Sequence, residues 1–394
     1  MMRLAVVSPH FPVLPHPHYG QPIYFSLLGL QRIAPVELEV FCPLPTYPAA
    51  FGRLFNSAQV RAMRNYSPPG IRAHYFGYPA LPGVSRPLNG IVSAGYLLPQ
   101  LRQFRPDLIL AYWLYPGGYA AVRAGRRLGV PVIVGSRGSD LRWVKDRFTR
   151  FFVRKTLLNS AAVLTVSGEL RDQAIRFGAS PSRVHTILNG CDSSVFHYRS
   201  RPEVRSRLGI PSSARLVLFV GRISAAKGLR DLVRALAIAG RRDPHLRLCC
   251  IGAGNFEYGE FEKDLRAEIA ALQLNSHVEF LGVKTPPEVA DWLAAANVLC
   301  LPSHTEGCPN VVIEALSCGT PVVGTTVGGI PELVRDGETG ILIPPHDEDR
   351  LATALLEGCA RDWDSLRIST VFQRSWDTVG RETYAVCEKV LYAP

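Results

Sequence analysis

The segment at residues 301–345, LPSHTEGCPNVVIEALSCGTPVVGTTVGGIPELVRDGETGILIPP, constrains the fold more than any other part of the chain. It begins at the end of an apolar run, residues 298–301, which is typical of a buried parallel strand. After a polar loop, Pro309 stands where a helix would begin, and Gly319 stands where it would end. A second apolar run, residues 321–324, predicts another strand. The segment therefore predicts a strand–loop–helix–strand unit of an α/β protein with a parallel sheet.

Two acids lie in this unit, Glu306 in the loop and Glu314 about one turn into the helix. The predicted helix N-terminus, which includes Gly307, Cys308 and Asn310, has N–H groups without helical acceptors and can face an anion. An ordinary βαβ crossover with two solvated acids would explain the acid spacing alone. The combination with Gly-Cys-Pro-Asn and a later Gly-Gly turn is more specific, and it predicts a ligand site.

The whole stretch resembles the nucleotide-sugar site of retaining GT-B glycosyltransferases, of the family 4-like type that builds cell-wall polysaccharide, exopolysaccharide and lipopolysaccharide. Glu306 and Glu314 match that family's pattern of an acid, seven residues and a second acid. The resemblance implies an α/β fold in which two Rossmann-like domains face each other across a cleft, with a C-terminal helix that crosses back to the first domain. It also implies sugar transfer from a nucleotide diphosphate-sugar to a hydroxyl, with retention of configuration.

The resemblance also implies roles for the two acids. Glu314 would hold the ribose hydroxyls of the donor, and Glu306 would hydrogen-bond sugar hydroxyls near the reacting carbon. Attack on the face from which the diphosphate leaves is the preferred mechanism. Double displacement with Glu306 as nucleophile is the alternative.

Two cations follow the first predicted strand of the second half, residues 216–220. Arg222 comes directly after that strand, and Lys227 stands at the entry to the next helix. Both resemble the family's Gly-Arg…Lys-Gly pair, which implies that they grip the donor diphosphate. Physically, the leaving group is a nucleotide diphosphate, so fixed cations stabilise its growing charge. By the same resemblance, Val283 at the tip of a later strand would lie near the nucleobase.

The loops of the first half depart from the family pattern. The first loop keeps one glycine, Gly20, where the family has a Gly-Gly pair that faces the donor phosphates. In a later loop, Arg137 replaces the histidine of the His-Gly-x-Asp found in many relatives. Arginine cannot act as a base, but it can hold a phosphate or carboxylate. Asp140 ends that motif and is expected to cap a helix over residues 141–159.

A turn at residues 189–192 resembles the one that precedes the family's hinge, so we place the domain boundary near residue 197. The expected domains are an acceptor-side domain at 1–197, a nucleotide-sugar-binding domain at 198–375, and a helix at 376–394 that returns to the first domain. Residues 43–90 are rich in Pro, Gly, Tyr and Arg and are expected to help line the acceptor cleft.

The charge of the chain is unevenly distributed. Residues 1–200 contain 23 Lys/Arg and 8 Asp/Glu, a balance of +15, whereas residues 201–394 contain 21 and 25, a balance of −4. A lipid-linked or saccharide acceptor and an anionic membrane fit the basic half better than nucleic acid, for which no binding module is recognisable. The basic arginines of 141–159 would contact the membrane, while Phe148, Phe151 and Phe152 would pack into their own domain. A solvated basic surface is the alternative.

The composition indicates the cellular compartment of the protein and the cofactors that it is expected to use. No apolar run reaches the ~18 residues that a membrane span needs, and the first one is too short for a signal peptide. The nine cysteines show no paired spacing, which favours a reducing cytoplasm. We expect a cytoplasmic enzyme, with peripheral contact on the cytoplasmic face of the membrane. Asp347 and Asp349 are interpreted as helix caps, and neither a metal nor another cofactor is expected beside the donor.

Other functions remain open on the sequence. A nucleotide-sugar epimerase or a glycan phosphorylase can share this architecture, and a non-catalytic protein would bind the donor without turnover. A nucleic-acid-binding protein would explain the basic half but would leave Glu306 and Glu314 without a role.

Overall fold

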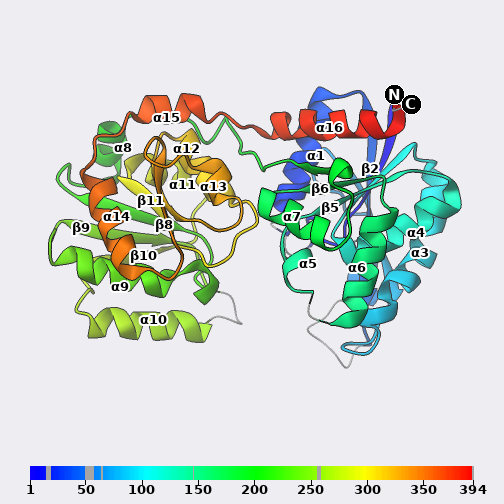
Figure 1. The fold of residues 1–394 in the computed structure, drawn as a ribbon, viewed down its shortest axis with the longest axis horizontal. Helices are drawn as coiled ribbons and strands as arrows, with labels where there is room; N and C mark the ends of the chain where they lie inside the picture. The colour runs from blue at the N-terminus through cyan, green and yellow to red at the C-terminus, as the bar shows by residue number, and fades with distance from the viewer. Residues whose placement is uncertain (15–18, 49–56, 64, 145, 255–258, 393–394) are drawn as a thin grey trace. The chain divides into compact units, whose positions relative to one another are not determined.

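The computed structural model describes residues 1–392 except 15–18, 49–56, 64, 145 and 255–258 (Figure 1). The chain divides into two compact units, one of Met1–Asn189 with Trp376–Pro394 and one of Gly190–Ser375. Each unit is built on one parallel sheet, so the predicted pair of Rossmann-like α/β domains is confirmed.

The first unit has a seven-stranded sheet in the order β3-β2-β1-β4-β5-β6-β7. Its central strands are buried along their whole length, which explains why they read as continuous apolar runs. The strands are β1 (Met2–Val7), β2 (Val36–Thr46), β3 (Arg72–Pro79), β4 (Leu108–Tyr112), β5 (Val132–Ser136), β6 (Ala162–Thr165) and β7 (Val184–Thr186). The helices are α1 (Gln21–Ile33), α2 (Ser57–Ala62), α3 (Asn89–Phe104), α4 (Tyr119–Leu128), α5 (Ser139–Arg142), α6 (Arg147–Asn159), α7 (Gly168–Arg176) and α16 (Trp376–Tyr392).

The second unit has a six-stranded sheet in the order β10-β9-β8-β11-β12-β13. The strands are β8 (Arg215–Val220), β9 (Leu246–Ile251), β10 (Val278–Gly282), β11 (Val298–Leu301), β12 (Val322–Thr325) and β13 (Gly340–Ile343). The helices are α8 (Arg201–Leu208), α9 (Leu229–Gly240), α10 (Gly259–Ala271), α11 (Pro286–Ala295), α12 (Asn310–Ser317), α13 (Ile330–Leu333), α14 (Glu348–Ala360) and α15 (Ser365–Val371). Asp347 caps α14 by accepting from the Arg350 N–H at 2.9 Å, as predicted.

The strand order reverses once in each sheet, between β1 and β4 in the first unit and between β8 and β11 in the second. Ligands of open α/β sheets bind at the carboxyl ends of the strands at such a point. The described segments that leave these strands are 8–14 and 113–118 in the first unit, and 221–228 and 302–309 in the second. The sequence motifs singled out above lie mainly on these loops.

The boundary between the units falls after Asn189 and not near residue 197. Just beyond it, the Cys191 N–H donates to the Arg374 carbonyl at 2.9 Å, and Cys191 forms a β-bridge with Ser375. Farther on, Arg199 forms an ion pair with Asp291. These contacts tie residues 190–199 to the second unit, which a sequence turn alone does not reveal.

The last helix, α16, belongs to the first unit, where it packs along α1 (Figure 1). The Trp376 ring stacks on Phe25 with centroids 6.0 Å apart, and Arg32 pairs with Asp377. The predicted return of the C-terminal helix to the first domain is therefore confirmed.

The helix predicted over 141–159 is wrong as a single element, because the chain forms α5 and α6 with a break between them. Asp146 caps α6 by accepting from the Thr149 N–H at 2.7 Å, and Lys145 lies outside the described residues. No helix in the described part of the chain combines the length and the apolar character that a membrane span requires.

Candidate active site

An ion pair joins the two switch-point loops of the second unit. Lys227 Nζ donates to Glu306 Oε1 at 2.6 Å, and Ser303 Oγ donates to the same oxygen at 2.7 Å. The Glu306 side chain is only 8% exposed, whereas that of Lys227 is 27% exposed. An ammonium has three N–H donors, and Glu306 takes one of them. The pair therefore holds a cation in a fixed place with donors left for a ligand.

Backbone contacts explain why these loops meet. The His304 N–H donates to the Ala226 carbonyl at 3.0 Å. Gly228 has a φ of +69°, and a Cβ there would lie 1.9 Å from the Pro302 carbonyl oxygen. Glycine is required by both the conformation and the close approach. The Lys-Gly pair thus seats Lys227 against the loop that carries Glu306.

The Gly-Gly turn after β12 supports the Glu306 loop from another side. Gly328 has a φ of +59°, and a Cβ there would lie 2.1 Å from the Glu306 carbonyl oxygen. The Gly329 N–H donates to the Gly307 carbonyl at 2.8 Å, and Thr325 Oγ1 donates to the Ser303 carbonyl at 2.6 Å. The conformation of the acidic loop is therefore fixed by two further segments of the same unit.

Helix α12 begins at Asn310 with Pro309 as its N-cap, close to the predicted start. The side chain of Pro309 makes no capping hydrogen bond, and Cys308 just before it is buried. Glu314 lies one turn into the helix and is half-buried. Burial raises the pKa of Glu314 from 4.5 to about 7. Within the described residues of the second unit, no cation pairs with this carboxyl group.

Arg222 and Val283 occupy two other loops of the same unit. Arg222 is exposed directly after β8, where the neighbouring Ile223 N–H donates to the Ala253 carbonyl at 3.3 Å. Val283 follows edge strand β10 and is 77% exposed. The structure thus joins Lys227 to Glu306 directly and places Arg222 at the same switch point, whereas Val283 lies two strands away from β8.

Asp140 does not cap a helix, which corrects our expectation. It lies inside α5, and its carboxylate accepts from Ser136 Oγ at 2.8 Å and from the N–H groups of Leu114 and Gly138 at 3.1 Å. Its burial raises the carboxyl pKa, and the hydrogen bonds oppose that effect. Asp140 therefore holds the loops after β4 and β5 together.

Arg137 and Gly20 lie at two further strand ends of the first unit. Arg137 Nη2 donates to Asn189 Oδ1 at 3.0 Å, and its guanidinium lies 5.9 Å from the Tyr112 ring centroid. Gly20 precedes α1, and a Cβ there would lie 2.3 Å from the His10 carbonyl oxygen. Gly20 therefore has a packing role within this unit.

The switch point of the first unit opens into a cavity of about 490 Å³. The His10 ring lies 3.9 Å from the Trp113 ring, and His10 Nδ1 is hydrogen-bonded to the Tyr19 hydroxyl. Burial lowers the pKa of His10 to about 4, so its ring is neutral at neutral pH. The wall also includes aromatic and proline residues from the predicted acceptor segment, among them Pro45, Tyr47, Tyr78 and Pro82.

Comparison with known proteins identifies the family. Residues 200–360 match the model of glycosyl transferases group 1, and residues 29–190 match that of the glycosyl transferase 4-like domain. The chain is 31% identical to D-inositol 3-phosphate glycosyltransferase 1 of Catenulispora acidiphila, over 77% of this chain and 82% of that protein. The chain belongs to the family 4-like glycosyltransferases.

Other relatives match this glycosyltransferase over different lengths. The D-inositol 3-phosphate glycosyltransferase of Thermobispora bispora is 33% identical over 62% of this chain and 60% of its own length. The putative teichuronic acid biosynthesis glycosyltransferase TuaC of Bacillus subtilis is 29% identical over 90% of this chain and 88% of that protein. Anabaena Alr3699/HepE, solved in complex with UDP, has a TM-score of 0.77 at 18% identity, over 99% of this chain and all of that one. That similarity supports the GT-B fold.

Several candidate residues of this glycosyltransferase escaped the sequence analysis. Ser303 precedes Glu306 by three residues and gave no signal apart from its loop position. His10 gave no signal, because its contact with Trp113 joins two segments that are distant in sequence. Asp231, His304 and His346 form a cluster from three elements, which no local spacing could reveal.

Proposed function

We propose that this glycosyltransferase moves a sugar from a nucleotide diphosphate-sugar to a hydroxyl acceptor with retention of configuration. The observation that carries the proposal is the Lys227–Glu306 ion pair at the switch point of the second unit, on the loop that leads into α12. It combines a fixed cation for phosphate with a buried carboxylate for sugar hydroxyls.

The proposed reaction breaks the bond between the anomeric carbon and the diphosphate oxygen, and the diphosphate leaves with the electron pair. Lys227, Arg222 and the N-terminus of α12 stabilise the charge on that leaving group. The acceptor hydroxyl attacks from the same face and gives its proton to the departing phosphate oxygen. Glu306 accepts hydrogen bonds from sugar hydroxyls near the reacting carbon.

A uridine nucleotide is the first donor to test, because the similar Anabaena protein was solved with UDP and with UDP-glucose. A thermal-shift screen of nucleotide sugars tests the proposal without knowledge of the acceptor. A donor at 100 times its dissociation constant should add about 2.7 kcal/mol to the free energy of unfolding. Absence of stabilisation by every nucleotide sugar would contradict the proposed donor class.

Glu314 makes donor binding depend on pH. A carboxylate accepts hydrogen bonds from both ribose hydroxyls only when it is ionised, and its pKa of about 7 leaves it mostly protonated at pH 6. We expect affinity for UDP-glucose to rise by up to about tenfold from pH 6 to pH 8. Isothermal titration calorimetry would measure this, and Glu314→Gln should remove the dependence. An unchanged pH profile in that variant would exclude the role.

Ionisation of Glu314, which should strengthen donor binding as pH rises, should lower the stability of the free protein over the same pH range. Since the folded state holds the proton more tightly than the unfolded state, Glu314 lowers stability progressively as pH rises from about 4.5 to 7. Glu314→Gln should therefore raise the free energy of unfolding at pH 8 and leave it unchanged near pH 4. Because the side chain is partly solvated, the gain at pH 8 should be roughly 1–2 kcal/mol. Urea unfolding at both pH values measures it.

We propose that transfer needs no metal ion, since Lys227, Arg222 and the start of α12 can neutralise the diphosphate. The rate in a chelator should equal the rate without one. A rate that is lost in chelator and restored by magnesium or manganese would contradict this.

We propose the cavity of the first unit as the acceptor site. Its aromatic rings can pack against the face of a sugar or cyclitol ring, and the neutral ring of His10 can form a hydrogen bond with a hydroxyl. The names of the relatives, inositol phosphate and teichuronic acid enzymes, together with the +15 balance of residues 1–200, favour an acceptor that carries a phosphate or another acidic group.

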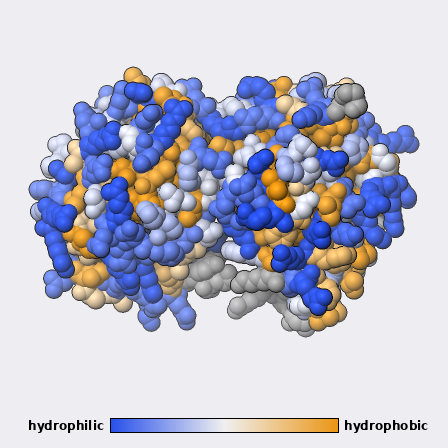
Figure 2. Space-filling view, viewed as in Figure 1, coloured by the Kyte–Doolittle hydropathy of each residue, from blue (hydrophilic) through white to orange (hydrophobic). Residues whose placement is uncertain are grey.

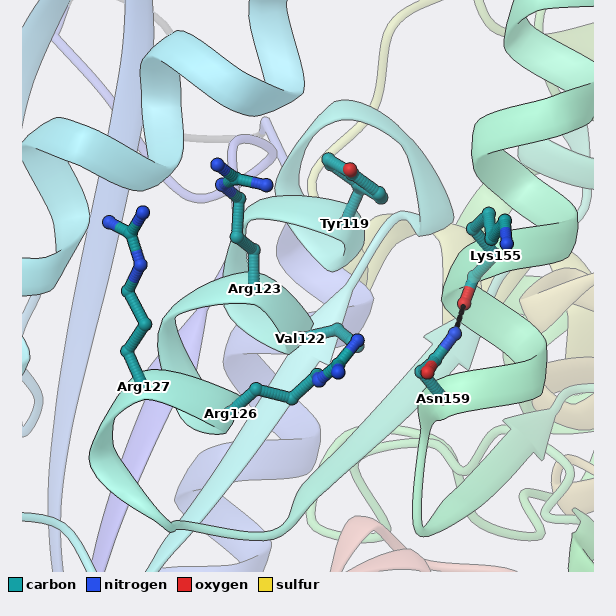
Figure 3. Close-up of a pocket in the computed structure, with 7 residues that line it drawn as sticks. All are labelled: Tyr119, Val122, Arg123, Arg126, Arg127, Lys155 and Asn159. Carbon is teal, nitrogen blue, oxygen red and sulfur yellow. Dashed lines mark hydrogen bonds between the residues drawn. The ribbon is translucent and has the colours of Figure 1, made fainter.

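We also propose that α4 and α6 form a docking surface for the cytoplasmic face of an anionic membrane. Between them lies a cavity of about 400 Å³, which Figure 3 shows with Arg123, Arg126 and Arg127 on α4 and Lys155 on α6. None of its described lining residues is acidic, and none of these four cations pairs with a described acid. Basic side chains grouped in this way attract anionic lipid headgroups.

Exposed aromatic rings lie on α6 beside one of these cations, since Lys155 Nζ is 5.5 Å from the Phe151 ring centroid. Phe148 and Phe151 are 58% and 55% exposed, so the predicted packing of both into the domain is wrong. Phe152 does pack, stacking on Tyr115 with centroids 5.2 Å apart. Figure 2 shows hydrophobic side chains among hydrophilic ones over the part of the first unit that contains α6. Exposed aromatic rings beside cations are typical of surfaces that enter the lipid interface.

Sedimentation with lipid vesicles tests the docking surface. Wild type should bind anionic vesicles more strongly than neutral ones, and salt should weaken binding because it screens the charges. Replacing Arg123, Arg126, Arg127 and Lys155 by Glu should reduce partitioning at least about a hundredfold, given about 1 kcal/mol for each cation. A matched variant with Arg241, Arg242, Lys263 and Arg350 replaced by Glu should bind like wild type. Equal binding by both variants would show that the cations of α4 and α6 do not form the docking surface.

A further inference from the structure

Three side chains of the second unit converge outside the Lys227–Glu306 pair. Asp231 lies in the first turn of α9, His304 in the loop after β11, and His346 in the loop between β13 and α14. All three positions lie at the carboxyl edge of the sheet, where the strands end. One potential ligand atom from each lies within 4.8 Å of the other two.

The contacts within this cluster centre on one carboxylate oxygen. His304 Nε2 lies 2.8 Å from Asp231 Oδ2, and His346 Nδ1 lies 3.8 Å from the same atom. The two imidazole rings are 3.8 Å apart between centroids. In a tetrahedral zinc site with bonds of about 2.1 Å, ligand atoms lie about 3.4 Å apart. The two distances to Asp231 Oδ2 lie on either side of that spacing, and the ligand atoms of His304 and His346 lie within 4.8 Å of each other.

The backbone supports the position of both histidines. The His304 N–H donates to the Ala226 carbonyl at 3.0 Å, which fixes the loop. His346 has a φ of +62°, a left-handed conformation that costs energy for any residue with a Cβ. That conformation directs the chain so that the His346 ring reaches Asp231, although its side chain is otherwise 65% exposed.

We propose that Asp231, His304 and His346 form a binding site for a transition-metal ion of the zinc, cobalt or nickel class. Two imidazole nitrogens and one carboxylate are a ligand set that these ions prefer over magnesium or calcium. The exposure of His346 leaves an open side for water or another ligand. This proposal does not rest on the proposed sugar transfer. A metal ion bound here would not take part in that reaction, which we propose to be independent of metal.

Titration of the metal-free full chain with Co²⁺ tests the proposal, with visible absorption reporting the coordination of the ion and Zn²⁺ displacing it. All nine cysteines are buried, so thiolate coordination should not interfere. His304→Ala, His346→Ala and Asp231→Asn should each weaken binding by about a hundredfold or more. His245→Ala, which removes an exposed histidine elsewhere in the same unit, should leave the affinity unchanged.

If the less exposed His304 is needed for folding, the His346→Ala variant still tests the proposal. Circular dichroism and thermal unfolding of His346→Ala should match those of wild type. Wild-type affinity in folded His346→Ala would overturn the proposal. The proposal would also be overturned if replacing the histidines of residues 8–20 abolished metal binding while replacing His304 or His346 did not. Neither outcome would bear on donor binding, which is measured separately.

Discussion

Replacing Lys227 by alanine is expected to lower kcat/KM for sugar transfer by about a hundredfold or more, the scale of losing one preorganised electrostatic contact. Lys227 is held 2.6 Å from Glu306 by two packed loops, so a water molecule or a neighbouring cation cannot reproduce its position. Steady-state rates with the donor selected by thermal shift would measure the loss. Lys227→Arg should retain more activity, because it keeps the charge.

The control for this experiment is Lys263→Ala on α10, which removes an exposed cation of the same unit. It should leave kcat/KM unchanged. Near-normal turnover in a folded Lys227→Ala variant would exclude Lys227 from the diphosphate site. A loss that is matched by Lys263→Ala would indicate a general effect of charge.

Glu306→Gln is the second large effect that we expect. The amide keeps the shape of the side chain and an oxygen that can accept from Ser303 Oγ, but it loses the charge that pairs with Lys227. If Glu306 only binds sugar hydroxyls, kcat should fall by about 10²–10³ and the product should keep its configuration. If Glu306 is the nucleophile of a double displacement, turnover should be abolished. Single-turnover kinetics with product analysis separates the two mechanisms.

A double-mutant cycle adds a check on the pair itself. Because Lys227 and Glu306 are in direct contact, the combined loss in Lys227→Ala with Glu306→Gln should be smaller than the product of the two separate losses. Full additivity would show that the ion pair is not a functional unit.

The sequence predicts well wherever local spacing and apolar runs determine the structure. The strand at Val298–Leu301, the start of α12 after Pro309 and the cap at Asp347 are all as expected. Buried parallel strands read as apolar runs, and caps depend on residues close in sequence. The sequence selected Lys227 and Glu306 separately and did not predict their contact, although both follow strands that meet at the switch point.

What the sequence did not predict depends on contacts between distant residues. The break before Asp146 divides the basic helix, and the solvent exposure of Phe148 and Phe151 follows from which face of α6 packs. Asp140 binds Leu114, 26 residues away, which a local capping rule cannot anticipate. The raised pKa of Glu314 likewise arises from burial by the folded unit.

Proton NMR of the sugar product, formed from the donor chosen by thermal shift and a candidate hydroxyl acceptor, tests retaining glycosyl transfer most directly. We predict that the first product has the same anomeric configuration as the donor, and that one nucleotide diphosphate is released for each product molecule only when acceptor is present. A product of inverted configuration would contradict retention. An epimerised nucleotide sugar that forms without release of diphosphate would contradict transfer itself.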